Sequence, residues 1–401
     1  MLVLRARHQH LHESFLVTSR PAGGPRSDSA ELAVLATAKV VSNTALRWVG
    51  LFLPTLERAF SSTTGTLTGI MGVAELGGLS TVATGRALDR GHERRTFALG
   101  LAAVSVSSLI ALYGTVTAFA ISFMVLVIGV TNLTVAGHAW IGHRVPFAAR
   151  GRAIGLFETS WAIALLVGAP LLALLIRWFG WRGPYTALAI GAAVASVAVA
   201  TLVSPGVSRH DGKADGAGRL PRSAWPPMLA AAFTGAAGLG MFVVSGAWFG
   251  EAHQMSTGGL GMIAAGLGMV ELVSSSSVAS FGDRVGSRRS VLFGLAVLGV
   301  GIALILFSEE SLALAIAGLL VYLAGFEFAF VSALAMVTEA APLARGRAIG
   351  ISSAVGTVAR SGAMVASGQL FEAFGMNGSL ALTGSAALLA AVLVMLGTTG
   401  P

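Results

Sequence analysis

Long apolar runs, separated by short polar segments, extend over the chain from about residue 33 to residue 397. Most of these runs contain 20 or more residues, and a helix needs about 20 apolar residues to cross the hydrocarbon core of a bilayer. The runs are too long and too uniformly apolar for the strands of a membrane barrel, and lipid offers an unpaired backbone no hydrogen-bond partner. The pattern therefore predicts an all-α membrane protein with twelve transmembrane helices. They cover residues 33–56, 66–86, 96–115, 117–141, 152–176, 184–203, 227–249, 258–281, 290–307, 311–339, 347–371 and 377–397.

One polar interruption divides the predicted helices into two sets of six. It runs from Ser204 to Pro227 and is rich in glycine, proline and charge, which is typical of a hydrated linker. The pattern predicts a six-helix bundle over residues 31–203, a linker over 204–226 and a second bundle over 227–401.

The segment over residues 1–30 is polar and basic, and we predict a polar tail there. It lacks the apolar stretch of roughly 7–15 residues that a secretory signal requires. Three histidines in it are potential metal ligands, but an unstructured tail holds no ligand geometry, so a solvated tail is the favoured interpretation. They are His8, His10 and His12. We expect neither a metal site nor a cofactor.

Composition supports the membrane interpretation. Of 401 residues, 55% are apolar and only 11% are charged, whereas soluble domains are about 25% charged. The chain therefore lacks the polar residues to cover a water-facing surface. Cysteine is absent, which excludes disulfides and thiolate metal sites.

Basic residues predict the orientation. With the N-terminus inside, cytoplasmic segments hold twenty of the 26 Lys and Arg residues and the outer loops hold three, which is a strong positive-inside bias. We therefore predict an inner, or bacterial-type plasma, membrane protein with both termini cytoplasmic. This bias explains the net charge of +8 without nucleic acid, which would require a folded basic face.

An internal repeat relates the two halves. The heptapeptide ARGRAIG occurs at residues 149–155 and again at 344–350, an offset of 195 residues. VAEL at 73–76 returns as MVEL at 269–272. Matching segments at a nearly constant offset indicate gene duplication, and two parallel six-helix halves are a known transporter design.

The turn after the second predicted helix, GRALDRGHERR at residues 85–95, resembles the signature of the major facilitator superfamily. The matching residues are Gly85, Asp89, Arg90, Arg94 and Arg95. The second glycine of the signature is displaced to Gly91, with His92 in its usual place. The counterpart in the second half has Asp283, Arg284, Gly286, Arg288 and Arg289, with Ala279 where the first glycine would stand.

The resemblance implies that these turns form a conformational latch. Asp89 would face the start of the eleventh helix, which carries Arg345 and Arg347. Charge-assisted hydrogen bonds that form when the inner side is shut and break when it opens would give two states. By the same symmetry, Asp283 would face the start of the fifth helix. That start carries Arg150 and Arg152. The alternative is that these arginines only anchor the topology, which would not require the aspartates.

The fifth helix, over residues 155–170, is similar to the glycine-rich run of antiporter-type family members. It keeps Gly155, Gly168 and Pro170, but Glu158 replaces an expected glycine. The similarity points to efflux, and the departures leave the direction open. The fourth-helix arginine often linked to proton coupling is missing, and His138 is the basic residue there.

Several ionisable side chains fall within predicted helices, where a charge costs about 2.5–3.5 kcal/mol on insertion scales. They are Arg47, Glu75, Glu158, Glu271, Glu327 and Arg360, with Lys39 and Glu339 nearer the inner surface. Depth along antiparallel helices favours an Arg47–Glu75 pair and places Glu327 level with Arg360. Glu271 has no basic residue at its depth and is a candidate for protonation.

Glu327 is the leading candidate for proton coupling or substrate binding. By the resemblance, its helix lines the central cavity, and its symmetry mate is Asn132 in the fourth helix. Phe330 lies one turn away on the same face, and an acid beside an aromatic surface can hold a lipophilic cation or bind a proton. Aromatic residues that would line the same cavity are Trp48, Phe52, Trp161, Trp248 and Phe249.

These features favour a secondary active transporter that exports a small organic molecule by proton coupling. No nucleotide-binding loop is present, because the glycine-rich stretches lie within helices. The expected partners are membrane lipid, a small-molecule substrate and protons, with a monomeric protein. The alternatives are proton-coupled uptake of a small, possibly anionic, solute, a non-transporting sensor, and an intramembrane enzyme, for which the embedded residues offer no nucleophile–base pair.

Overall fold

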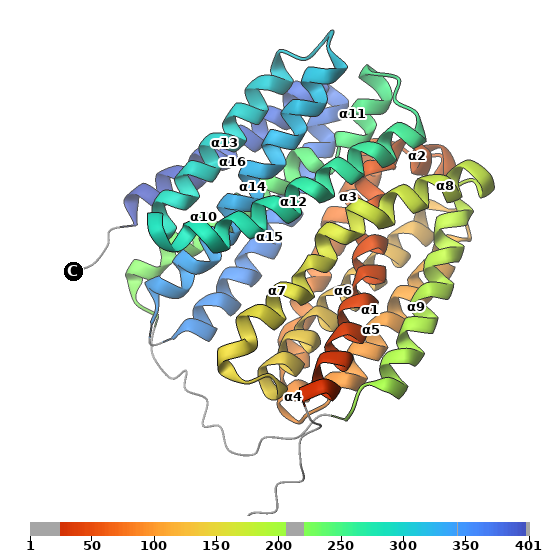
Figure 1. Ribbon diagram of the computed structural model, residues 1–401. Coiled ribbons are helices and arrows are strands. Elements are labelled where there is room, and N and C mark those ends of the chain that lie inside the picture. Colours follow the sequence, from red (N-terminus) through yellow and green to blue (C-terminus); the bar gives the residue numbers. More distant parts are fainter. Residues whose placement is uncertain (1–24, 206–219, 343, 398–401) are drawn as a thin grey trace, which may run out of the picture.

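A computed structural model describes residues 25–205, 220–342 and 344–397. Over these residues the chain forms helices joined by short turns, without β-strands. Figure 1 shows two bundles side by side, one from the red-to-yellow half of the sequence and one from the green-to-blue half. The all-α fold predicted from the sequence is confirmed.

The N-terminal bundle contains all six helices predicted for it, three of them interrupted. The first interruption follows Leu51, the second is the 3₁₀ turn η1, and the third is the π turn η2. Pro170 lacks the backbone N–H of a regular helix, which accounts for the irregularity beside it. The elements are α1 (Pro25–Leu51), α2 (Leu53–Phe60), α3 (Thr64–Glu75), η1 (Leu76–Ser80), α4 (Thr81–Asp89), α5 (Glu93–Ala111), α6 (Val116–Arg144), α7 (Phe147–Ile163), η2 (Ala164–Gly168), α8 (Ala169–Phe179) and α9 (Arg182–Leu202).

The C-terminal bundle repeats this order with fewer interruptions. Its first transmembrane helix is broken near Val243, where α10 ends and α11 begins. The elements are η3 (Arg222–Ala224), α10 (Trp225–Phe242), α11 (Ser245–Ala252), α12 (Thr257–Val285), α13 (Ser287–Leu306), α14 (Leu312–Ala340), α15 (Arg345–Phe374) and α16 (Met376–Leu396).

Eleven helices of the described residues are long and apolar enough to cross a membrane, and α1 completes the set of twelve. Helix α1 carries Lys39 and Arg47, which lower its hydropathy. Their side chains are only 0% and 12% exposed, so these charges face the protein and not the lipid. A charge in a span is tolerated where it faces the bundle interior and finds a partner.

The predicted domain boundaries differ from the helix ends by a few residues. Helix α1 begins at Pro25, so residues 25–30 of the predicted tail are helical. The predicted linker ends in η3 and the start of α10. Residues 1–24, which include the three tail histidines, and residues 206–219 lie outside the described residues.

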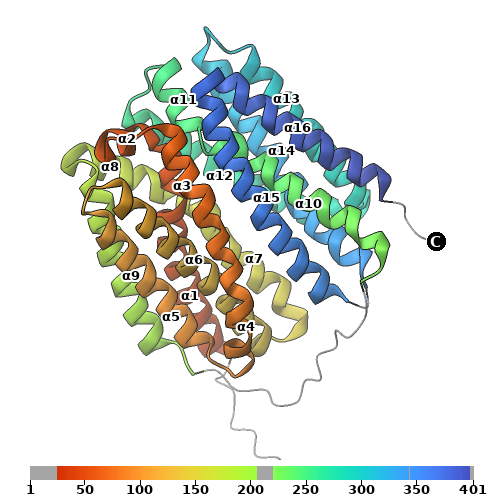
Figure 2. The ribbon, with the colours of Figure 1, turned by 180° about the vertical axis from the view of Figure 1, so that it is seen from behind.

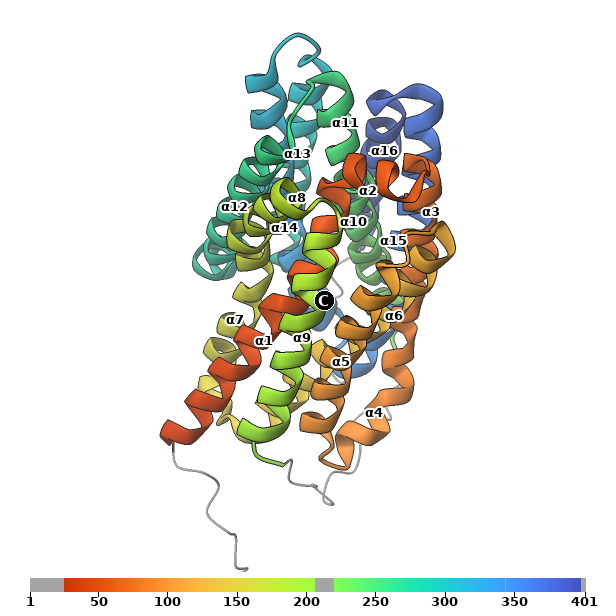
Figure 3. The ribbon, with the colours of Figure 1, turned by 90° about the vertical axis from the view of Figure 1, so that its right-hand side faces the viewer.

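The two bundles pack together at one end of the molecule. Helix α3 runs along α15, η2 and α8 pack on α12, and α2 packs on α11. Figures 2 and 3 show this contact region from two further sides. We call it the sealed end, and we call the opposite end, where α9 stops and α10 starts, the linker end. Among the described residues, α4, α6, α10 and α14 pack extensively only within their own bundles.

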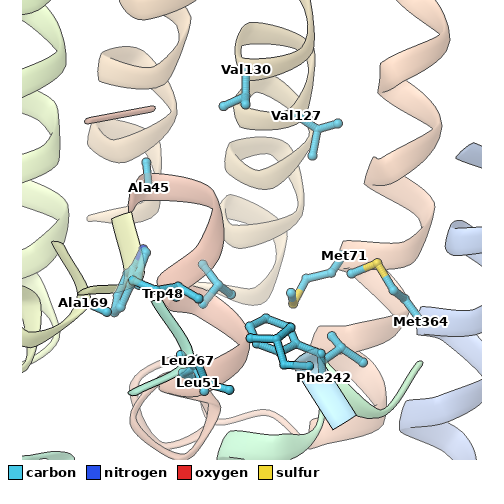
Figure 4. Packing of buried hydrophobic residues seen from close by; sticks show 14 of the residues in the cluster. Ala45, Trp48, Leu51, Met71, Val127, Val130, Ala169, Phe242, Leu267 and Met364 are labelled. Carbon is cyan, nitrogen blue, oxygen red and sulfur yellow. The ribbon is translucent and has the colours of Figure 1, made fainter. Parts of the chain in front are cut away.

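Side chains from both bundles interlock at the sealed end. In Figure 4, Met71 of α3, Met364 of α15 and Phe242 of α10 belong to one group of buried side chains. Four of the aromatic residues expected to line a cavity are instead buried in the core, because bulky rings fill the contact between the bundles. They are Trp48, Phe52, Trp248 and Phe249.

A glycine on α15 permits a close approach between the bundles. A Cβ at Gly368 would lie 1.7 Å from Thr68 Oγ1 and 3.1 Å from Gly65 Cα. The Thr68 hydroxyl is itself held by a hydrogen bond to the Thr64 carbonyl at 2.8 Å. The side chain therefore cannot move away freely, and α3 and α15 meet this closely only when residue 368 is glycine.

Replacing Gly368 by alanine should open the sealed end. Spin labels at T117C and N377C, in a chain without native cysteine, should report a longer separation between the bundles in G368A. Gly362 on the same helix has open space around its Cα, so G362A is the matched control and should leave the distance unchanged. Equal distances in G368A and G362A would contradict the packing argument.

Candidate functional site

Two ion pairs join the bundles through the middle of the membrane domain. Arg47 of α1 contacts Glu271 of α12, and Arg360 of α15 contacts Glu75 of α3. In the second pair, Arg360 Nη2 and Nε lie 2.8 and 2.9 Å from Glu75 Oε1. Each arginine therefore takes its carboxylate from the opposite bundle.

This arrangement corrects the pairing inferred from depth. Depth suggests Arg47 with Glu75 and puts Glu327 level with Arg360, whereas the structure pairs Arg47 with Glu271 and Arg360 with Glu75. Glu271, which was expected to lack a basic partner, has one. Depth fixes the level of a residue along the membrane, but rotation of the helix about its axis decides which neighbour it meets.

Aromatic groups hold Arg47 in place. Its Nη1 donates to the Trp161 carbonyl at 3.2 Å. Its Cζ lies 5.6 Å from the centre of the Trp161 ring and 5.7 Å from that of Phe242, within cation–π distance. The Glu271 side chain is only 8% exposed. Arg47 thus has one charged partner and two aromatic neighbours in a largely dry site.

Glu327 of α14 belongs to the same group. It is half-buried, and the charges of Glu271 and Arg47 both act on its carboxyl group. Among the described side chains it has no hydrogen-bond partner. We call Arg47, Glu271 and Glu327 the central charge cluster. It contains two carboxylates and a single guanidinium.

Aromatic residues extend from this cluster along α14. The Phe326 and Phe330 ring centres are 5.5 Å apart. A Cβ at Gly235 would lie 3.6 Å from the Phe330 ring and 3.5 Å from Arg360, so Phe330 and Arg360 share a wall formed by α10. The sequence places Phe330 one turn from Glu327, and the structure keeps both half-buried.

Asn132, the symmetry mate of Glu327, lies apart from the central charge cluster. Its Nδ2 donates to Ser80 Oγ at 2.7 Å and to the Ile128 carbonyl at 2.8 Å, and its Oδ1 accepts from Thr84. These bonds tie α6 to η1 and α4. Its amide is therefore occupied in packing the N-terminal bundle.

A second cluster of ionisable side chains lies inside the N-terminal bundle. The sequence analysis did not predict that these side chains contact one another. Glu158 Oε1 of α7 is 2.7 Å from Lys39 Nζ of α1 and 2.7 Å from His138 Nε2 of α6. The Phe157 ring covers Lys39 at 4.1 Å. We call Lys39, His138 and Glu158 the N-half triad. The available signal was Glu158 itself, an acid where the antiporter-like run has glycine.

The proposed latch residues do not pair in the described conformation. Asp89, Arg90 and Arg95 are exposed, and Asp89 has no ion pair with any described side chain. Helix α4, which ends at Asp89, packs on α5 and α6. Arg94 donates to the Val203 carbonyl at 3.3 Å. The latch stays a prediction for another conformation.

The partner turn is only partly described. Arg150 caps the end of α6 through the Gly142 and Val145 carbonyls, at 2.6 and 3.0 Å. Arg152 and Arg347 are exposed. The side chains of Asp283, Arg284 and Arg345 lie outside the described residues.

The displaced glycine of the signature has a backbone role. Gly91 has φ +79° and Gly286 has φ +85°, and the two are separated by the repeat offset of 195 residues. Both occupy the left-handed region that side chains disfavour. Each turn therefore has a glycine at its left-handed position, two residues after Asp89 in the first half and three after Asp283 in the second.

Three acids lie near one another at the sealed end. Glu57 of α2 accepts a hydrogen bond from Thr64, and Glu372 Oε1 of α15 accepts one from the Gly65 N–H at 2.7 Å. The latter bond joins the bundles. Burial raises the pKa of Glu57, and the nearby charges of Glu251 and Glu372 raise it further, against the opposing effects of Thr64 and Arg58.

The fold and the site define a helical membrane transporter built from two six-helix halves. The chain matches the profile of the Major Facilitator Superfamily over residues 35–276 and again over 228–401, and it belongs to that family. It is therefore a secondary transporter and not an enzyme.

One curated relative is the uncharacterized MFS-type transporter YwfA of Bacillus subtilis (strain 168), 25% identical over 198 residues. That match covers 46% of this chain and 47% of the relative, so the chain matches about half the length of that protein.

Solved structures of similar fold cover nearly the whole chain. A bacterial homolog of the human lysosomal transporter Spinster, inward-facing and occupied, has TM-score 0.75 and 14% identity, covering 94% of this chain and 97% of that one. The D-xylose–proton symporter has TM-score 0.75 and 16% identity, covering 92% and 99%. At these identities the likeness shows the fold.

Replacing Glu75 by glutamine should lower the free energy of unfolding by about 3–5 kcal/mol, because Arg360 then stays buried without a counter-charge. The double variant E75Q/R360M removes both charges and should recover most of the loss. Chemical denaturation in detergent measures both values. A double variant no more stable than E75Q would contradict the pairing.

The sealed end should open as pH rises. The pKa of Glu57 is raised while the bundles are in contact, and hydration on opening would return it to the ordinary range. Protonated Glu57 therefore stabilises the sealed end fully below the ordinary glutamate pKa, and this stabilisation is lost as pH rises through the raised value.

The T117C/N377C spin-label distance as a function of pH tests this expectation. The parent chain should show a growing population of longer distances as pH rises. E57Q, which mimics the protonated acid, should remain closed at every pH. Glu309 is exposed and E309Q is the control, which should behave as the parent. A pH response that survives in E57Q would assign it to another group.

Proposed function

We propose that this protein exports a small lipophilic organic cation in exchange for a proton. The observation that carries the proposal is the charge count of the central charge cluster. Arg47 neutralises one carboxylate, and the second remains without a described partner. A negative charge left alone in a dry membrane domain is costly. The site therefore favours one further positive charge, from a proton or from a cationic substrate.

Competition between the proton and the substrate cation for these carboxylates would exchange one for the other. When the substrate cation occupies the carboxylates, the proton is excluded, and when the proton arrives the substrate is released. Because Arg47 and Glu271 belong to different bundles, protonation of Glu271 would also weaken a contact that holds the bundles together. Site occupancy and bundle movement are thereby linked, as alternating access requires.

Aromatic side chains favour a lipophilic cation over a hydrated one. The rings of Trp161 and Phe242 already lie within cation–π distance of the Arg47 guanidinium. Phe326 and Phe330 provide a further aromatic wall beside Glu327. Such faces attract organic cations that have lost their water.

The charge pattern argues against uptake of an anionic solute. Both arginines in question, Arg47 and Arg360, are already held by carboxylates. An anion would have to displace Glu271 or Glu75 and leave that acid unpaired.

By the positive-inside bias, we place the linker end in the cytoplasm of an inner or plasma membrane, with the monomer as the working unit.

Exchange of one proton for one monovalent cation moves no net charge. The concentration gradient of the substrate cation should therefore depend on the pH difference across the membrane and not on the membrane potential. One pH unit corresponds to about 1.36 kcal/mol, which supports roughly tenfold accumulation of the cation.

Purified protein in liposomes with an imposed pH gradient tests the proposal, with ethidium as the probe cation. Ethidium should accumulate on the acidic side, about tenfold per pH unit, whether or not the membrane potential is clamped to zero. E327Q should abolish this accumulation because its amide cannot exchange a proton. Glu339 is exposed on the same helix, and E339Q should transport normally.

Three outcomes would count against the proposal. Accumulation on the alkaline side would indicate uptake by symport. Gradient-driven accumulation that persists in E327Q would remove Glu327 from the coupling site. The absence of ethidium accumulation in the parent protein would exclude this class of cation.

A further inference from the structure

The two basic members of the N-half triad differ in their access to water. The Lys39 side chain is 0% exposed, whereas those of His138 and Glu158 are 42% and 35% exposed. His138 lies six residues before Arg144, at the linker end of α6, which is about 9 Å along the helix axis. The triad thus has a buried end at Lys39 and an open end at His138.

The buried end adjoins the central charge cluster. Lys39 Nζ lies 5.8 Å from the centre of the Trp161 ring, and Arg47 Cζ lies 5.6 Å from it. Both ionisable groups therefore lie near the same indole ring. The Phe157 ring lies 4.1 Å from Lys39 Nζ and 5.5 Å from the His138 ring, measured to the ring centres.

One carboxylate serves two bases in this triad. Glu158 Oε1 lies 2.7 Å from both Lys39 Nζ and His138 Nε2. The triad is neutral when Lys39 is charged and His138 is neutral. It is equally neutral when His138 is charged and Lys39 is neutral. A proton can therefore change its position here without creating net charge in a medium where net charge is costly.

We propose that the N-half triad is a proton relay between the central charge cluster and the linker end. This inference rests on the proposed proton exchange and adds the route by which the proton leaves or enters. As the proton moves toward the linker end, the Lys39 Nζ–H bond breaks and a Glu158 Oε1–H bond forms. That bond then breaks as the His138 Nε2–H bond forms, so Glu158 is a carboxylate before and after.

Other ionisable groups on the elements around the triad are held elsewhere or lie away from it. Within the described side chains, this leaves Lys39 and His138 as the bases that share Glu158. The other groups are Arg47 on Glu271, His143 on Glu93, Arg144 near Asp28 and Glu31, Arg150 and Arg94 on backbone carbonyls, the exposed Arg95 and Arg152, and Arg182, Glu251 and His253 at the sealed end.

Histidine NMR of the full chain in lipid nanodiscs tests the relay without any substrate. The ring-nitrogen signal lost in H138Q identifies His138. At one fixed pH, K39M should raise the share of protonated His138 and E158Q should lower it, because one variant removes the competing base and the other removes the shared acid.

The chain contains a matched control pair. His143 Nδ1 contacts Glu93 at the linker end of the same helix, outside the triad. E93Q should move the His143 signal and leave that of His138 unchanged. If E158Q fails to fold because Lys39 loses its counter-charge, K39M and the double variant K39M/E158Q carry the comparison. A His138 signal that changes in neither K39M nor E158Q overturns the relay.

The experiments distinguish a failure of the relay from a failure of the transport proposal. A His138 signal that responds to Lys39 and Glu158, without ethidium exchange, removes the proposed function and keeps the proton site. Ethidium exchange with an uncoupled His138 keeps the function and removes the relay. If both hold, H138Q should slow proton-driven exchange at least tenfold and leave ethidium–ethidium counterflow near the parent rate, which a merely structural role would not produce.

Discussion

A charge buried in a membrane domain needs an opposite charge in contact with it, and this constraint organises the protein. The cost of an unpaired buried ion is several kcal/mol. Arg47 and Arg360 both meet the requirement with an acid of the opposite bundle. The polar contacts that hold the halves together are therefore contacts that reorientation must break. Whatever changes the charge of those acids also changes the balance between conformations.

The internal duplication does not extend to the charges around these two pairs. Glu75 and Glu271 occupy equivalent positions in the two halves, in VAEL and MVEL. The arginines are not equivalents, because the repeat offset from Arg47 leads to Phe242, whose ring lies 5.7 Å from the Arg47 Cζ. Glu327 adds a second acid on one side alone, where its repeat mate is Asn132. The symmetric fold thus carries an asymmetric charge pattern.

The sequence was sufficient for the helices and the two halves, because lipid imposes length and apolarity on every span. It was insufficient for the contacts between charges. Arg47 and Glu75 do lie in adjacent helices of one bundle, yet depth alone cannot say that Arg47 faces α12. Depth places Lys39 nearer the inner membrane surface but does not reveal that its side chain is fully buried in the protein. Helix rotation and bundle packing decide these contacts and this burial, and the hydropathy pattern predicts neither.

The described conformation also indicates which way a proton could travel. At the sealed end, α15 meets α3 through glycines whose replacement would bring atoms within 3 Å of one another, so water has little access there. Toward the linker end, the exposed His138 and Glu158 follow the buried Lys39 in order. A central acid closed from one side and connected to ionisable groups on the other is what alternating access demands of a coupling site. Under the proposed exchange, the proton would therefore reach linker-end water in this conformation, through side chains of the N-terminal bundle.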